Sequence, residues 1–276
     1  MALTVNTNTA SLNAINNLNQ TQRSLSGNYE RISSGLRISK AADDAAGLGV
    51  AESLNAQSSS GRVAMRNTND GISVIQTAEG AMDSVGDIIS RMRELAVQSS
   101  SETLADDERA YIQDEFEQLS AEVDRIASSS NFNGTALCDG TTTAMDVQVG
   151  VMNTVNDRIS ITLSDLTAST LGVDTAAVDL SSASTAQAAI DTFDTALDSV
   201  SSYRSDLGAA QNRLDSALSN METYVENLES AESSIRDADF AYETAELAKN
   251  QILQQAGVSV LAQAKGMNQG VLSLLG

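Results

Sequence analysis

The chain has 276 residues, of which 37 are acidic and 16 basic, so its formal net charge is −21 and nucleic acid, which is bound through Lys and Arg, is not an expected partner. The sequence contains no His, the commonest general base and metal ligand, and its single Cys138 excludes an internal disulfide and a paired-cysteine metal or redox site. The composition therefore predicts a protein that is not an enzyme and that has no catalytic residues, no cofactor and no metal.

The N-terminal residues lack the basic and apolar regions of a secretory signal peptide. Apolar residues then recur at alternating steps of three and four, a spacing that predicts a helix with one packing face. The stretch 40–49 breaks this stripe with small residues and two acids, and Asp43 or Asp44 is expected to cap the next helix. The stripe comprises Ile15, Leu18, Gln22, Leu25, Tyr29, Ile32 and Leu36.

Two further helices are predicted, one running to about Ser99 and one from Leu104 to Ile126. Their stripes are Val74, Ala78, Ala81, Val85, Ile88, Met92 and Leu95 in the first, and Ile112, Phe116, Leu119, Val123 and Ile126 in the second.

A region of short strands is predicted after these helices. Asn133-Gly134 is typical of a turn, and 147–149 and 159–163 alternate apolar and polar residues as half-buried strands do. We therefore predict a small hairpin region at about 131–180 that packs on the helices. Asn133-Gly134-Thr135 also fits a glycosylation sequon, but the turn is the preferred interpretation.

The longest stripe lies between residues 190 and 235 and predicts a helix in a coiled-coil-like contact. A helix of 45 residues is about 70 Å long at 1.5 Å per residue. The absence of Pro from the sequence favours such uninterrupted helices, and no segment approaches the 18 consecutive apolar residues of a membrane span. A last stripe, Leu253, Val260, Ala264, Met267, Val271 and Leu274, continues to the C-terminus.

The charge is unevenly distributed along these elements. Residues 1–42 carry a net +3 and residues 244–276 a net +1, whereas residues 43–243 carry −25. Chain ends are usually polar and frayed, so apolar ends that flank an acidic centre predict ends buried against something. In a single small globule, two such ends could simply pair with each other.

We predict a mainly α fold: a long antiparallel helical bundle or coiled-coil rod with a small β-hairpin region. Residues 1–42 and 237–276 form paired terminal helices, and residues 43–236 form a helical domain that carries the hairpins. Two long helices cannot bury all their apolar faces against each other, so self-association in an ordered array is expected to complete the burial. The acidic centre would face outward and keep the assembly soluble.

Both ends of the sequence resemble bacterial flagellin. The resemblance lies in 11–14, 32–38 (ISSGLRI) and 41–47 (AADDAAG) near the N-terminus, and in 234–243 (SIRDADFAYE) and 256–264 (AGVSVLAQA) near the C-terminus. It implies an extracellular structural subunit that polymerises into the flagellar filament for swimming motility, in a short form with little or no variable outer domain. The filament-core residues implied are Ile15, Leu18, Leu25, Ile32, Leu36, Leu253, Val260, Val271 and Leu274.

The resemblance also implies partners. They are other copies of the chain, hook-filament junction and filament cap proteins, and a flagellar type III export chaperone that covers the C-terminal helix from about Phe240 to Leu275. The segment 91–98 (RMRELAVQ) resembles the part of flagellin that a host Toll-like receptor senses, which implies Arg91, Leu95 and Glu115 as contacts. Leu95 also belongs to a packing stripe, so subunit contacts are the first role expected of this segment.

Alternatives to these interpretations are a hook-filament junction protein and a type III secreted coiled-coil binding protein that does not polymerise. Carboxylate pairs could suit a cation or acid–base chemistry. The pairs Asp43-Asp44 and Asp237-x-Asp239 are better explained as helix starts, and Asp106-Asp107 and Asp114-Glu115 as a solvated acidic face.

Overall fold

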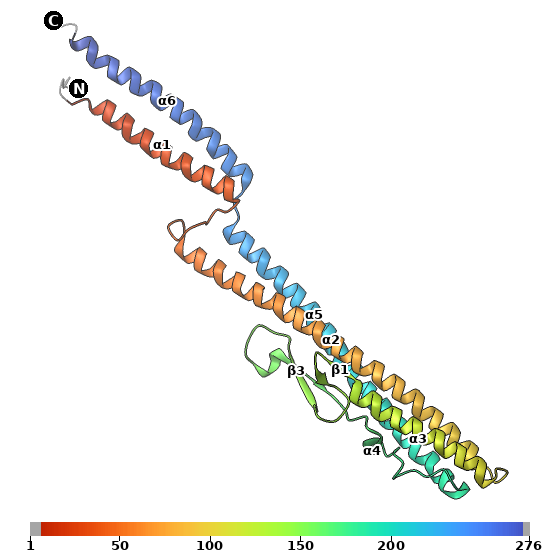
Figure 1. Cartoon of the computed structure of the whole chain (residues 1–276). Helices are drawn as coiled ribbons and strands as arrows, with labels where there is room; N and C mark the ends of the chain where they lie inside the picture. Colours follow the sequence, from red (N-terminus) through yellow and green to blue (C-terminus); the bar gives the residue numbers. More distant parts are fainter. Residues whose placement is uncertain (1–6, 273–276) are drawn as a thin grey trace. The chain divides into compact units, whose positions relative to one another are not determined.

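The computed structural model describes the backbone of residues 7–272 and the side chains of residues 7–266. Helices dominate it, and the strands form two small sheets of two strands each, which confirms the predicted mainly α fold (Figure 1). In chain order the elements are α1 (Thr9–Ser34), α2 (Ala45–Ser99), α3 (Asp106–Ser129), β1 (Asn131–Phe132), β2 (Thr135–Ala136), β3 (Ala144–Gln148), the 3-10 turn η1 (Val155–Asp157), β4 (Arg158–Thr162), α4 (Ala168–Leu171), α5 (Ala183–Arg236) and α6 (Phe240–Leu272).

The chain divides into two compact units. The terminal unit comprises residues 1–58 and 227–276, and the central unit comprises residues 59–226. The division predicted from the sequence, at residues 42 and 237, falls at the breaks between helices, whereas the compact units divide inside α2 and α5. The helix turns next to the breaks belong to the terminal unit because they bond to each other there: Ser58 Oγ donates to Glu229, 3.1 Å away, and Asn55 donates to Glu232, 3.2 Å away.

The core of the central unit lies where α2, α3 and α5 pack together. The predicted stripes of these helices provide it, and Phe116 of α3 meets Phe193 of α5 edge to face with ring centroids 6.0 Å apart. Arg93 pairs with Asp194, and Arg204 pairs with Asp83, which shows that this part of α5 runs antiparallel to α2. The helix α3 begins two residues after the predicted start, because residues 101–104 form a turn in which the Leu104 amide donates to the Ser101 carbonyl.

The predicted hairpin region also belongs to the central unit. A tight turn with positive φ at Asn133 and Gly134, 50° and 82°, joins β1 to β2, which confirms the turn interpretation of that pair. The antiparallel strands β3 and β4 pair Val147 with Ile159, and both side chains are buried against the helices. The segment that follows buries further apolar side chains in the same core: Leu163, Leu166, Leu171, Val173, Val178 and Leu180.

In the terminal unit, α1 packs along α6 in the antiparallel direction. The start of α1 meets the far end of α6, where the Asn8 amide group donates to the Ala264 carbonyl, and the end of α1 meets the start of α6, where Arg31 bonds Glu243. Gly35 caps the end of α1, and its φ of 72° is the left-handed conformation that glycine adopts at low cost. Over residues 7–272, no helix is both long and apolar enough to cross a membrane.

Candidate assembly surfaces

The apolar faces of α1 and α6 are only partly covered within the chain. Of the core residues predicted from the sequence, Leu25 is buried, Leu18, Ile32 and Leu36 are half-buried, and Ile15, Leu253 and Val260 are exposed. The side chain of Val271 and the whole of Leu274 lie outside the described residues. Further large apolar side chains are exposed on the same two helices: Leu12, Tyr29, Phe240, Tyr242, Ile252 and Val258.

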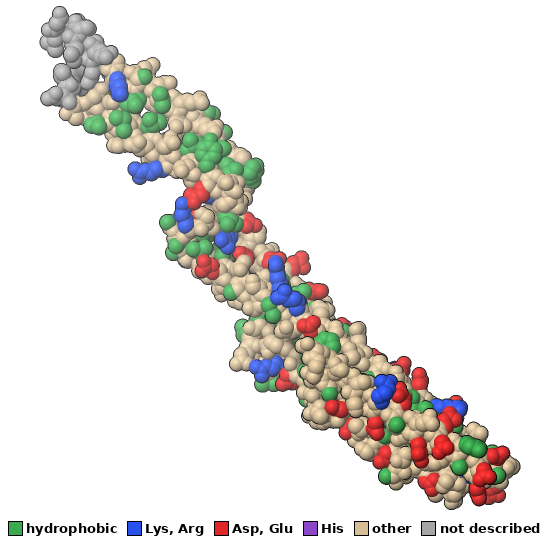
Figure 2. Space-filling model, in the orientation of Figure 1, with side chains coloured by type: hydrophobic (Ala, Val, Ile, Leu, Met, Phe, Trp, Pro, Cys, Tyr) green, Lys and Arg blue, Asp and Glu red, His purple; other side chains and the backbone are tan. Residues whose placement is uncertain are grey.

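Hydrophobic side chains are visible along α1 and α6 in Figure 2, where acidic side chains are sparse. Large apolar side chains left exposed together on one pair of helices mark a site of association. The arrangement matches the expectation that two long helices cannot cover each other completely. The terminal unit therefore presents an incomplete hydrophobic core.

A buried polar cluster also joins α1 to α6, and the apolar stripes of the sequence did not predict it. Asn28 is 2% exposed and Glu243 is 5% exposed. The Asn28 amide donates to one Glu243 oxygen at 2.9 Å, and Arg31 Nε donates to the other at 2.7 Å. Tyr29, which the predicted stripe placed at the contact, is half exposed instead. The signal that could have found the cluster is the spacing of Glu243 and Asn250, which are seven residues apart and so share a helix face.

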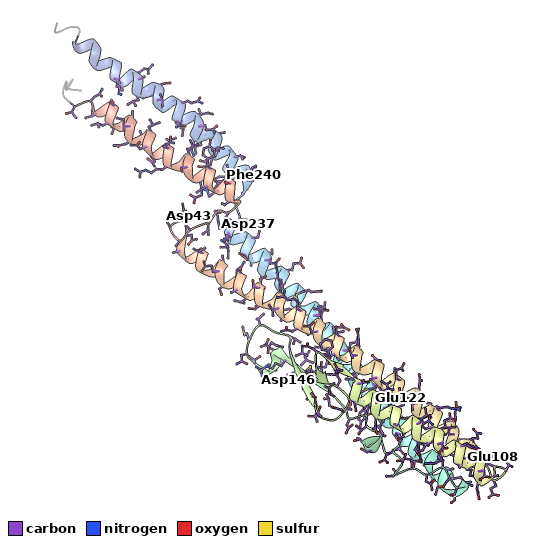
Figure 3. The ribbon with its side chains drawn as sticks, in the orientation of Figure 1. Asp43, Glu108, Glu122, Asp146, Asp237 and Phe240 are labelled. Atoms are coloured by element: carbon purple, nitrogen blue, oxygen red, sulfur yellow. The ribbon has the colours of Figure 1, made fainter. Side chains whose placement is uncertain are left out.

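The breaks between the helices of the terminal unit are tied together by the backbone. The Arg37 amide donates to the Arg236 carbonyl at 2.7 Å, and the Ala238 amide donates to the Gly35 carbonyl at 2.9 Å. Asp43 and Asp237 lie at these breaks, and Phe240 begins α6 (Figure 3). Arg37 also donates from its guanidinium to the Ile235 carbonyl. These bonds fix the end of α1 and the start of α6 beside each other.

The acids at these breaks cap helices, as the sequence predicts. Asp44 accepts from the Gly47 amide at 2.9 Å and begins α2, and Asp239 accepts from the Ala241 amide at 2.9 Å and begins α6. Hydrogen bonds from the backbone of Ser39, and then of Lys40, lower the pKa of Asp43. Among the described residues no group of three or more His, Cys, Asp or Glu side chains could hold a metal ion.

The surface of the central unit is acidic, and acidic side chains gather over α3 and the neighbouring end of α2 in Figure 2. Arg91 lies among them: it pairs with Glu94 at 2.9 Å and with Glu115 of α3 at 2.8 Å, and these hydrogen bonds raise the pKa of Arg91. Leu95, one turn further along α2, is 1% exposed and packs in the core. The structure thus places Arg91 and Glu115 together on the surface and Leu95 beneath it.

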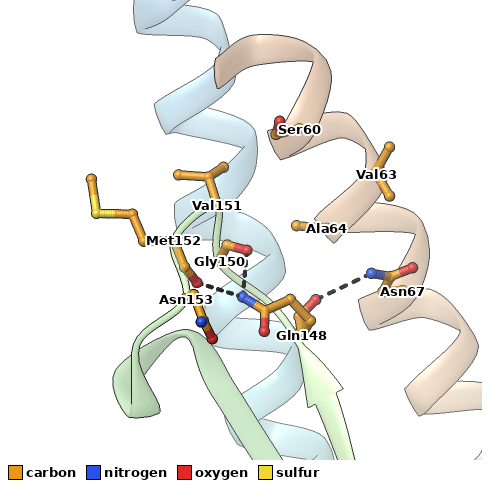
Figure 4. Close-up of a pocket in the computed structure, with 9 residues that line it drawn as sticks. All are labelled: Ser60, Val63, Ala64, Asn67, Gln148, Gly150, Val151, Met152 and Asn153. Carbon is orange, nitrogen blue, oxygen red and sulfur yellow. Dashed lines mark hydrogen bonds between the residues drawn. The ribbon is translucent and has the colours of Figure 1, made fainter. Parts of the chain in front are cut away.

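A groove of about 390 Å³ in the central unit separates α2 from the loop after β3 (Figure 4). The loop is held in shape by Gln148, whose side-chain amide donates to the carbonyls of Gly150 and Met152 at 3.0 and 2.8 Å. The lining contains no ionisable side chain, so no general acid or base lines the groove beside the Ser60 hydroxyl. It consists of Ser60, Val63, Ala64, Asn67, Gln148, Gly150, Val151, Met152 and Asn153.

Comparison with known families explains an architecture of apolar end helices and an acidic centre. Residues 5–143 match the family model of the bacterial flagellin N-terminal helical region, and residues 190–275 match that of the bacterial flagellin C-terminal helical region. The chain belongs to the bacterial flagellin family. Flagellins are structural proteins, so the prediction of a protein that is not an enzyme is confirmed. The chain is a structural subunit of the extracellular flagellar filament and polymerises with itself.

Individual relatives agree with this assignment. A flagellin of Halalkalibacterium halodurans is 44% identical over 94% of this chain and 93% of its own length. The flagellar filament 33 kDa core protein of Treponema phagedenis is 39% identical over 98% of this chain and 99% of its own. By contrast, the match to the B-type flagellin of Pseudomonas aeruginosa, at 44% identity, covers 62% of this chain and only 35% of that protein.

The fold has a solved counterpart in the crystal structure of Bacillus cereus flagellin. The two chains share 30% identity with a TM-score of 0.50, and the match covers 56% of this chain and 88% of the other. The full-length matches to two relatives and the partial match to the Pseudomonas protein confirm the prediction of a short flagellin.

Proposed function

We propose that the terminal units of many copies form the inner core of the filament and that the central units form its outer layer. The carrying observation is the exposed apolar surface of α1 and α6, where Ile15, Leu253 and Val260 lack sufficient cover within one chain. Burial of such side chains stabilises an assembly by roughly 25 cal/mol per Å² of apolar area. The central region of the sequence, which carries a net −25, keeps the outside of the polymer soluble.

In this proposal residues 1–42 and 237–276 supply the core contacts. The residues assigned to them are Ile15, Leu18, Leu25, Ile32, Leu36, Leu253, Val260, Val271 and Leu274. The test is to concentrate the purified monomer with salt or with sheared filament seeds and to image it by electron microscopy. Long hollow filaments support the proposal. Persistent monomers or short rings contradict it and favour the junction-protein or binding-protein alternatives.

A core substitution adds residue detail to this test. Leu253→Ser removes an apolar side chain of α6 that is 47% exposed in the single chain, and it is expected to raise the concentration needed for polymerisation. Ser201→Ala changes an exposed position of α5 in the central unit and serves as the control. If both variants polymerise like the parent chain, Leu253 is not a core residue.

Before assembly, the apolar face of α6 needs a cover, and we propose that an export chaperone binds it from about Phe240 to Leu275. Ile252, Val258 and Val260 are exposed in the described part of this helix and make it prone to aggregation. A flagellar export chaperone co-expressed with the protein is expected to co-purify with the full chain and not with a chain that ends at residue 239. Equal recovery of both chains contradicts the proposal.

Three further partners follow from the same terminal surfaces and from α2. Junction and cap proteins of the flagellum are proposed to contact the terminal units at the two ends of the filament.

A host Toll-like receptor is proposed to contact Arg91 and Glu115, while the buried Leu95 supports this face of α2 from within the core. Arg91→Ala is expected to reduce signalling in receptor-bearing reporter cells, while Arg125→Ala, also an exposed arginine with an acidic partner, leaves it unchanged. Equal signalling from both variants contradicts the receptor proposal.

A further inference from the structure

The polar cluster between α1 and α6 is fully hydrogen-bonded although it lies in the contact between the two helices. Asn28 holds its centre: its side-chain amide donates to Glu243, and its side-chain oxygen accepts from the Asn250 amide at 3.2 Å. The second Glu243 oxygen accepts from Arg31. Asn250 is 8% exposed, so three of the four side chains are withdrawn from water while each keeps a partner.

The apolar contacts alone do not determine how α1 and α6 align along their length. Their stripes repeat every seven residues, and the contact contains small side chains such as Ser11 and Ala264. A slip of one helix by seven residues therefore presents a similar apolar face to its neighbour. Within one chain the backbone bonds at the breaks also favour the native alignment. Between copies, only a side-chain feature that occurs once along the contact can distinguish the native alignment from the slipped one.

The polar cluster is such a feature. A seven-residue slip moves Glu243 about 10.5 Å along the axis of α1, because each residue rises 1.5 Å. Both hydrogen bonds to Glu243, now at 2.9 and 2.7 Å, are then broken. A carboxylate left in an apolar contact without its partners is strongly disfavoured. Single buried polar residues fix register in coiled coils by the same physics.

We infer that Asn28, Arg31, Glu243 and Asn250 form a register lock that selects the alignment of α1 on α6 and rejects slipped pairings during filament growth. The inference rests on the proposed function, in which terminal units of neighbouring copies crowd together in the filament core. Each α1 then meets the α6 helices of other copies, whose apolar stripes are the same. The lock makes the aligned helix of its own chain the preferred partner.

Two exposed contacts beside the lock provide positions from which the register can be read. Gln254 donates to the Gln22 side-chain oxygen at 2.6 Å, and Gln251 donates to the Tyr29 hydroxyl at 3.1 Å. A cysteine pair at 22 and 254 can therefore form a disulfide only in the native alignment. Pairs of 22 with 247 and of 22 with 261 report slips of seven residues in either direction.

The experiment uses full-length chains with these cysteine pairs in a Cys138→Ala background. The chains are polymerised and oxidised mildly, and the disulfides are counted on non-reducing gels, which also separate links within one chain from links between chains. The register variant is Asn28→Leu/Glu243→Leu/Asn250→Leu. The matched control is Glu246→Leu/Lys249→Leu, which replaces a partly exposed ion pair on the same helix whose members bond each other and no residue of the lock.

In the parent and the control, links between 22 and 254 within one chain are expected to dominate. In the register variant, the ratio of native to slipped links is expected to fall by about a hundredfold. An unchanged ratio in filaments of the register variant overturns the inference.

If the register variant does not polymerise, Glu243→Gln replaces it, since this change keeps the volume and removes the charge. A fall of about tenfold in the ratio is then expected, and an unchanged ratio overturns the inference. Failure of the parent chain itself to form filaments would instead contradict the proposed function.

Discussion

Arg109 is a charged side chain that the core of the central unit requires. It is 7% exposed, and its guanidinium donates to the Ser99 carbonyl at 3.1 Å and to the Ser101 carbonyl at 2.7 Å, where α2 ends. Arg109→Ala leaves these carbonyls without their donor, at a cost of roughly 1–3 kcal/mol for each group that stays buried. We expect the free energy of unfolding to fall by about 2–4 kcal/mol in urea denaturation.

Arg125→Ala is the matched control for Arg109. Arg125 lies on the same helix and pairs with Glu122 at 2.6 Å, but the two side chains are 63% and 41% exposed. An exposed pair contributes about 0–1 kcal/mol. Equal destabilisation by the two substitutions would show that the contacts of Arg109 with the end of α2 contribute no more to stability than an exposed ion pair does.

The buried thiol of Cys138 makes the stability of the central unit depend on alkaline pH. Burial, with a smaller effect from Asp139, raises the pKa of its thiol from 9.0 to about 11. Because the folded pKa lies above the unfolded one, the buried neutral thiol contributes stability below pH 9, and this contribution is lost as the pH rises toward 11. At pH 8 we expect a thiol reagent to react at least about a hundredfold faster in guanidinium than with the folded chain.

The chain has one cysteine, so the reaction measured belongs to Cys138. Comparable rates in the folded and unfolded chain would contradict the burial of this thiol.

The burial of single residues could be predicted from the sequence only in part. The pattern identified Leu25 as a packing residue, but it could not show that Asn28 is buried, because its partner Glu243 is 215 residues away in the sequence. It also missed the burial of Arg109, which depends on how the turn after α2 folds back onto α3.

At the scale of elements, the turn between β3 and β4 depends on a glycine. The amides of Val149 and Gly150 both donate to the Asp157 carbonyl, and a Cβ on Gly150 would lie 1.8 Å from an Asp157 side-chain oxygen. That approach is far inside van der Waals contact, so Gly150→Ala must displace Asp157. We expect a loss of about 1–3 kcal/mol in unfolding free energy and faster amide exchange in β3 and β4.

Gly208→Ala provides the opposite case in the same unit. Nothing lies within 4 Å of a Cβ at this position of α5. Alanine favours a helix over glycine by up to about 1 kcal/mol, so this substitution is expected to stabilise the central unit in the same denaturation experiment. Destabilisation by Gly208→Ala would contradict the packing of α5 described here.

Long elements were predictable from the sequence because their periodic signal is strong. The stripe from Val74 to Leu95 is buried as predicted except for the partial exposure of Ile88, and α2 ends at the predicted Ser99. The bounds of short elements were harder to predict from the sequence. The strand β3 begins at Ala144, before the alternating pattern at 147–149, because backbone pairing with β4 extends it further than its apolar residues indicate.

At the scale of the whole molecule, charge and burial follow the same division. The contiguous core runs from Val74 to Leu214 and lies entirely within the central unit, whereas the exposed apolar residues of α1 and α6 belong to the terminal unit. The charge partition along the sequence predicted this contrast. It could not predict the polar lock between α1 and α6, because Glu243 and Asn28 are more than 200 residues apart and their pairing follows from the fold.

A chain trimmed to residues 43–236 tests whether stability and assembly reside in different units. It retains the whole contiguous core, so we expect a helical circular dichroism spectrum and one cooperative unfolding transition. It lacks α1 and α6 and is expected to stay monomeric under the salt and seeding conditions that polymerise the full chain. The full chain, treated in parallel, is the control for those conditions. Filaments from the trimmed chain would place the essential contacts in the central unit, and loss of helicity would show that its core needs the terminal helices.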